Sequence, residues 1–145
     1  MRIVIDTNIW IRILLRGRIT LPILEAWLAN RFRLVTSAEL LQEYNRVWQR
    51  PRLRKNIDPN QAATLYRQMQ VRAHIVDLKT IPPQCRDPKD HPVLATAIDG
   101  LAIAIVTGDD DLRADDELRT AMAAYGVQLW GVQSFFNALD SSQNQ

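Results

Sequence analysis

The sequence has little cysteine, little glycine and no long apolar run. Its 145 residues include one cysteine, Cys85, and five glycines. A single cysteine excludes an internal disulfide and a cysteine-rich zinc site, and the reducing cytoplasm is the simplest expected location. No apolar run approaches the roughly 20 residues that a membrane-spanning helix needs. No glycine-rich turn follows the apolar residues 2–5, which excludes a Rossmann-type dinucleotide site.

The charge is nearly balanced, with 18 basic and 16 acidic residues and a net charge of +2. A hydrophobic content of 47% with 23% charged residues is ordinary for a globular protein. The length fits one compact domain, which we expect over residues 1–140, with a flexible tail at 141–145. Because Asp6 would interrupt the apolar region of a signal peptide, we interpret the start of the chain as a first strand.

Strand-like and helix-like patterns alternate along the chain. The run at 102–107 is apolar at nearly every position, which is typical of a parallel strand covered on both faces. The alternation predicts an α/β sandwich with a central, mostly parallel sheet. The expected strands are 2–5, 33–37, 74–78, 102–107 and 127–131, and the expected helices follow Asp6 and cover 21–30, 38–49, 59–72, 92–100, 114–126 and 132–140.

Four acidic residues occur where such strands end or the neighbouring helices begin. Asp6 and Asp109 come directly after predicted strands, Glu43 lies about one and a half turns into the next helix, and Asp90 lies at the start of another. Ligands of parallel α/β sheets bind beyond the carboxyl ends of the strands, at the crevice where the strand order reverses. We therefore expect these four side chains to meet at one edge of the sheet.

Carboxylate oxygens are the ligands that Mg²⁺ and Mn²⁺ prefer, and phosphate oxygens complete the coordination. One ion, or two ions about 4 Å apart, could stabilise the displacement at a phosphodiester. Each acid also has a structural interpretation: Asp6 and Asp109 as turn caps, Glu43 as a solvated helix residue and Asp90 as a helix start. The joint occurrence of all four favours a cation site.

Four motifs in this order resemble those of the PIN-domain nucleases. They are DTN after the first strand, SAELLQEYNRVWQRP, DPKDHPVLATA and IVTGDDDL, and the resemblance spans Arg2 to about Leu139. Within that superfamily the chain is most similar to the VapC-like toxins of bacterial toxin–antitoxin systems.

The resemblance implies a Mg²⁺- or Mn²⁺-dependent endoribonuclease with three α/β/α layers and a five-stranded sheet. It implies a homodimer, an RNA substrate and a cognate antitoxin protein as partners. It also implies roles for individual residues. Asp6, Glu43, Asp90 and Asp109 would be the catalytic, metal-binding acids, with Thr7, Asn8, Thr107 and Asp111 in support. Asp87 is the alternative to Asp90, and His91 stands where we expect another residue type.

Five basic residues cluster around Pro51, close in sequence to Glu43. They form either a solvated helix end or a surface that binds RNA phosphates. These residues are Arg46, Arg50, Arg52, Arg54 and Lys55.

A non-catalytic binding module with the same fold is the alternative function. Two other classes of α/β protein are disfavoured. A haloacid dehalogenase phosphatase would need a second aspartate where the chain has Asn8, and a receiver domain would need a lysine after the fourth strand.

Overall fold

The computed structural model describes residues 1–84 and 88–143, apart from the side chains of Lys89 and Gln143. Cys85 and Asp87 lie outside the described residues. One five-stranded sheet has the order β3-β2-β1-β4-β5, and every pairing within it is parallel. The strands are β1 (Arg2–Ile5), β2 (Arg33–Ser37), β3 (His74–Val76), β4 (Ala104–Val106) and β5 (Gln128–Trp130). The predicted parallel α/β sandwich is confirmed.

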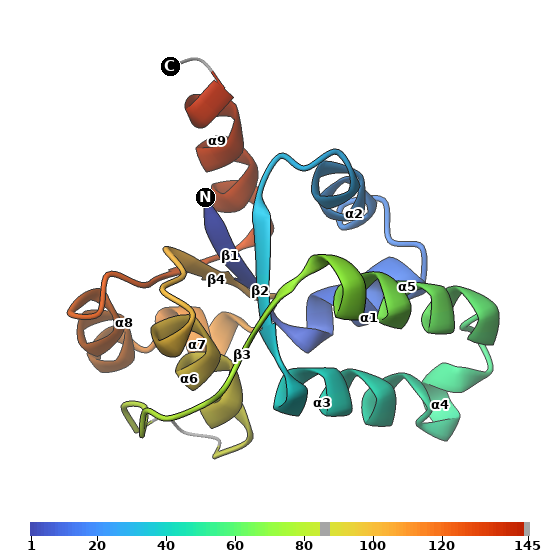
Figure 1. The fold of residues 1–145 in the computed structure, drawn as a ribbon, viewed down its shortest axis with the longest axis horizontal. Helices are drawn as coiled ribbons and strands as arrows, with labels where there is room; N and C mark the ends of the chain where they lie inside the picture. The colour runs from blue at the N-terminus through green and yellow to red at the C-terminus, as the bar shows by residue number, and fades with distance from the viewer. Residues whose placement is uncertain (85–87, 144–145) are drawn as a thin grey trace.

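The three central strands, β2, β1 and β4, are buried on both faces because helices cover both sides of the sheet (Figure 1). Ile3 and Ile5 of β1 enter one apolar core, whereas Val4 enters the other. Ala104, Ile105 and Val106 have no exposed surface. A strand that is buried on both faces has a continuous run of apolar residues in its sequence. The prediction of such a strand within residues 102–107 is therefore confirmed.

Two helical layers enclose the sheet. On one face lie α1 (Thr7–Leu14), α2 (Leu21–Leu28), most of α3 (Ala38–Trp48), α5 (Pro59–Arg72) and α9 (Val132–Gln143). On the other face lie α6 (His91–Asp99), α7 (Asp110–Ala114) and α8 (Asp116–Ala123). In the described ranges, no helix has the length and apolar character needed to span a bilayer.

Some boundaries differ from the prediction. Pro51 was expected only to stop a helix, but it also opens the short helix α4 (Pro51–Arg54). Proline is tolerated at the first helical position because the amide hydrogen it lacks would have no partner there. The helix α7 was not predicted, and α9 continues through residues 141–143 of the expected tail.

Helix α6 runs antiparallel to the strands and packs against them at a glycine. Arg2 Nε at the start of β1 donates to the carbonyl of Gly100, directly after α6. A Cβ on Gly100 would lie 2.3 Å from Val35 Cγ1 and 2.8 Å from the carbonyl oxygen of Thr96. Glycine therefore allows a close approach here, and the N-terminus of α6 points toward the carboxyl ends of the strands.

Candidate active site

The strand order reverses between β1 and β4. From β1 the chain builds β2 and β3 on one side, and then returns to add β4 and β5 on the other. Ile5 pairs with Val106, and the backbone N–H of Asp6 donates to the Val106 carbonyl at 2.9 Å. Asp6 and Thr107, the residues that follow these two strands, therefore lie side by side at the position where parallel sheets bind ligands.

Asp6 is a buried carboxylate held in place by three donors. Its side chain is only 8% exposed. It accepts from the backbone N–H of Thr7 at 2.8 Å, as the N-cap of α1, and from Thr107 Oγ1 at 2.8 Å. Asn8 Nδ2 is a more distant donor at 3.4 Å. These contacts fix the orientation of the carboxylate, which a cation ligand requires.

Glu43 reaches the same place from α3. Ser37, the last residue of β2, caps α3 by accepting from the N–H of Leu40 at 3.3 Å, so the helix starts at the carboxyl edge of the sheet. Thr7 Oγ1 donates to Glu43 Oε2 at 2.7 Å. Thr7 thus connects the two acids, with its backbone on Asp6 and its hydroxyl on Glu43.

Asp109 enters the site from the β4 side. Its N–H donates to Thr107 Oγ1 at 3.1 Å, and its Oδ1 caps α7 by accepting from the backbone of Asp111 at 2.9 Å. The capping uses one oxygen of this carboxylate, so Oδ2 is the atom that a cation would use. Asp111 itself is exposed in the first turn of α7.

The electrostatics of Asp6 show that the acids act on one another. Burial, followed by the negative charges of Glu43 and Asp109, raises the pKa of Asp6 from 3.8 to about 6, against the opposing hydrogen bonds from Thr107 and Thr7. Burial is the larger cause, because it removes water from the ionised form.

Asp90 lies at the same edge of the sheet. It ends a short 3₁₀ turn, Pro88–Asp90, and directly precedes α6. Farther along α6, Thr96 Oγ1 is 2.8 Å from Ser37 Oγ at the end of β2. Asp90 precedes Thr96 by six positions, which correspond to about 9 Å of helix, so Asp90 lies beyond the strand ends. A direct role for Asp90 in holding the cation stays a prediction.

The five basic residues around Pro51 are all exposed. Arg46 lies one helical turn beyond Glu43, whereas the other four surround α4. Figure 1 shows α4 at the end of α3 that points away from the sheet. Only Arg46 is therefore placed close to the acids along the helix, and contact of this cluster with RNA stays a prediction.

The donor set suits a hard divalent cation. Asp6, Glu43 and Asp109 offer carboxylate oxygens only, which Mg²⁺ and Mn²⁺ prefer. Among residues 1–84 and 88–143, no three acidic, histidine or cysteine side chains are placed closely enough to enclose a metal ion. Mg²⁺ commonly keeps several waters and takes one or two carboxylates together with substrate phosphate, so the residues fit a site completed by the substrate.

One residue near the site was not predicted from the sequence. Arg12 follows Asn8 by one turn of α1, and its Nη2 is 3.5 Å from the carbonyl oxygen of Gly108, beside Asp109. The N–H of Gly108 donates to Asn8 Oδ1 at 3.1 Å. The four-residue spacing places Arg12 on the same face of α1 as Asn8, but its contact with Gly108 depends on the pairing of β1 with β4.

A parallel sheet with buried and partly buried carboxylates at its switch point defines an α/β protein with a ligand site at this edge. The family model described as the PIN domain matches residues 2–111, about three quarters of the chain, and the protein belongs to this family. PIN domains typically use divalent metal ions, which agrees with the donor set. A comparison with curated proteins found no match.

Proposed function

We propose that the protein is a metal-dependent endoribonuclease that hydrolyses phosphodiester bonds of RNA. The observation that carries the proposal is the buried Asp6 carboxylate between β1 and β4, with Glu43 and Asp109 close enough to raise its pKa. A desolvated carboxylate with like charges beside it destabilises a fold unless a cation neutralises it. Membership of the PIN domain family supports the same chemistry.

The role proposed for each acidic residue follows from its hydrogen bonds and its place in the site. Asp6 would hold the cation, and Thr107 and the backbone of Thr7 fix its orientation. Glu43, Asp90 and Asp109 would complete the site through direct or water-mediated contacts. When bound there, Mg²⁺ or Mn²⁺ supplies charge stabilisation at a phosphoryl oxygen and lowers the pKa of water.

The supporting residues would act by holding the acids. The Thr7 hydroxyl fixes Glu43, and Asn8 joins the loop after β4 to α1 through Gly108. Asp111 contributes its backbone N–H to Asp109. These bonds hold side chains from three elements in place before the substrate arrives, which favours catalysis through preorganisation.

The competing function is a non-catalytic module that binds RNA or a protein partner. Such a module would need Asp6 and Asp109 only as helix caps and gains nothing from Glu43 beside them, whereas a metal-dependent hydrolase needs the three carboxylates together. Incubation of the purified protein with single-stranded and structured RNA, with Mn²⁺ and then with EDTA, separates the two. Cleavage only with Mn²⁺ supports the enzyme, and RNA binding without cleavage under every divalent-ion condition supports the module.

The biological setting belongs to the same proposal. The VapC-like resemblance supports a toxin, with a homodimer and an antitoxin protein as partners, and the single cysteine supports a cytoplasmic location. Growth arrest on expression, relieved by the product of an adjacent small reading frame, is the expected result. Unimpaired growth during expression of the folded protein would contradict the toxin assignment.

A further inference from the structure

A small pocket lies at the C-terminal end of α1, and one of its lining residues, Arg12, reaches the carbonyl oxygen of Gly108 beside Asp109. Its volume is about 280 Å³, and Arg12, Leu15, Gly17, Arg18, Ile19 and Thr20 line it. The chain forms it by turning back on the helix: Arg16 adopts a left-handed φ of 64°, and the N–H of Gly17 donates to the Arg12 carbonyl at 2.9 Å. A Cβ at Gly17 would lie 2.9 Å from Thr20 Oγ1 and 3.2 Å from the Arg12 carbonyl oxygen, so a larger residue would crowd this turn.

Arg12 joins this pocket to the acids. Its guanidinium lies over Gly108, where an added Cβ would be only 2.5 Å from Nη1. Gly108 separates Thr107, which holds Asp6, from Asp109. A group bound between Arg12 and the pocket wall would therefore be next to the group bound by the carboxylates.

The pocket combines positive charge with exposed apolar surface. Leu15 is 40% exposed and Ile19 is 74% exposed. Arg12 and Arg18 are exposed as well, and the ion pairs of the described residues involve other arginines, Arg31 and Arg113. The lining of this pocket combines two exposed arginines with an apolar wall. This combination matches a nucleotide, whose flat base favours apolar contact and whose flanking phosphates favour guanidinium.

We infer that this pocket binds one unpaired nucleotide of the RNA, adjacent to the phosphate at the carboxylate site. The inference rests on the proposed function for the identity of the polymer. The base lies against Leu15 and Ile19, and Arg12 and Arg18 contact the phosphates on its two sides. The pocket is slightly below the roughly 300–1,000 Å³ of typical ligand sites, so it suits one base rather than a longer segment.

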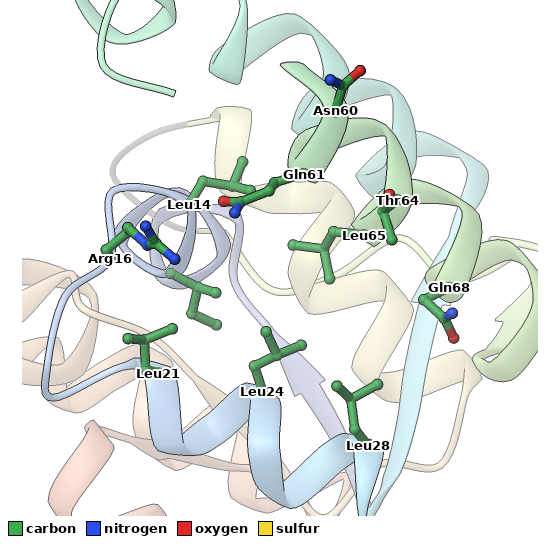
Figure 2. A pocket seen from close by; sticks show the side chains of 11 residues that line it. Leu14, Arg16, Leu21, Leu24, Leu28, Asn60, Gln61, Thr64, Leu65 and Gln68 are labelled. Atoms are coloured by element: carbon green, nitrogen blue, oxygen red, sulfur yellow. The ribbon is translucent and has the colours of Figure 1, made fainter. Parts of the chain in front are cut away.

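A larger pocket between α2 and α5 does not support a similar assignment. It measures about 420 Å³, and Figure 2 shows Leu21, Leu24 and Leu28 of α2 across from Leu65 and neutral polar residues of α5. Among the described residues of its wall, Arg16 is the charged one. Its lining therefore does not identify an occupant, whereas the Arg12 pocket has both charge complementarity and a neighbouring site.

The test is equilibrium binding of a 5′-labelled single-stranded RNA to the full chain in EDTA, measured by fluorescence anisotropy over a range of salt concentrations. Arg12→Ala and Arg18→Ala should each weaken binding about tenfold and lower the salt slope by about one. The matched control is Arg33→Ala, an exposed arginine at the amino end of β2, which should change neither value.

The apolar wall has a separate test. Ile19→Ser should weaken binding of RNA several-fold while the salt slope stays unchanged, because it removes base contact and no charge. An RNA in which every base is removed should bind the wild type and Ile19→Ser equally. Circular dichroism and melting temperature verify that each variant is folded.

The outcomes separate this inference from the proposed function. If the wild type never cleaves RNA but Arg12→Ala, Arg18→Ala and Ile19→Ser lose affinity as described, the nucleotide pocket is supported and the hydrolase proposal is wrong. If the wild type cleaves RNA and the folded variants bind it with wild-type affinity, the pocket assignment is wrong. A poly-glutamate peptide that loses affinity for Arg12→Ala and Ile19→Ser as RNA does would also overturn the assignment.

Discussion

Thr7 Oγ1 donates to Glu43 Oε2 at 2.7 Å, and this bond joins the first residue of α1 to the middle of α3. The two residues are 36 positions apart in the chain. Since the backbone N–H of Thr7 also donates to Asp6, one residue sets the relative position of two acids. The geometry of the proposed metal site therefore depends on a side chain that is not itself an expected ligand.

The first prediction concerns that bond. Thr7→Val keeps the side-chain shape but removes the donor, so Glu43 loses its fixed orientation. We expect kcat/KM for RNA cleavage with Mn²⁺ to fall about 10- to 100-fold, the usual effect of removing a residue that orients a metal ligand. Thr120→Val on the exposed side of α8 is the matched control. Unchanged kcat/KM and Mn²⁺ dependence in Thr7→Val would show that the bond has no role in the site.

The second prediction concerns stability and pH in the absence of divalent ions. Burial raises the pKa of Asp6 from its ordinary value of 3.8 to about 6 in the folded protein. As the pH rises from about 4 to 6, the unfolded chain loses this proton first, so the free energy of unfolding falls. Above pH 6 the free energy of unfolding stays about 3 kcal/mol below its value at low pH through this one group.

Asp6→Asn removes this titration. Its free energy of unfolding at pH 7.5 should exceed that of the wild type by about 2–3 kcal/mol. Any weakening of the hydrogen bonds from Thr7 and Thr107 in the variant would reduce this difference. Urea unfolding at pH 4 and pH 7.5 measures the free energy of unfolding of the wild type and of the variant. A wild-type protein that gains stability relative to Asp6→Asn between these pH values would contradict the raised pKa.

The third prediction concerns the packing of α6. Gly100→Ala would place a methyl group 2.3 Å from Val35 Cγ1, and overpacking of this kind costs about 1–3 kcal/mol. The double variant Gly100→Ala/Val35→Ala should lose less stability than the sum of the two single losses, because the new methyl group enters the space that the valine methyl leaves. Equal melting temperatures for wild type and Gly100→Ala would mean that α6 does not pack this closely on β2.

The fourth prediction concerns the basic residues around Pro51. Replacing Arg50, Arg52 and Arg54 together with alanine should weaken RNA binding and flatten its salt dependence if they contact phosphates. All three are exposed, so the fold should be retained. A salt slope equal to that of the wild type would identify the cluster as a solvated helix end.

The sequence predicted the strands and the placement of Asp6 and Asp109 because a buried parallel strand leaves a continuous apolar run with a polar residue after it. It did not predict α7, since five residues are too few to show a helical period. Pro51 was interpreted as a stop because proline ends one helix and begins another with the same local signal.

Contacts between elements that are distant in the chain could not be predicted from the sequence either. The position of Arg12 over Gly108 depends on the pairing of β1 with β4 and on the start of α1, which no local pattern records. The size of the Asp6 pKa shift likewise depends mainly on burial. Burial follows from the packing of whole layers rather than from the residues next to Asp6.

Cleavage of RNA by Asp6→Asn tests the central claim most directly. Single-turnover cleavage with Mn²⁺ is compared for the wild type, Asp6→Asn and the control Asp58→Asn, an exposed cap of α5. We expect activity in the wild type and in Asp58→Asn, loss of activity in EDTA, and none detectable in Asp6→Asn. Cleavage that persists in Asp6→Asn or in EDTA would contradict a metal-dependent mechanism centred on Asp6.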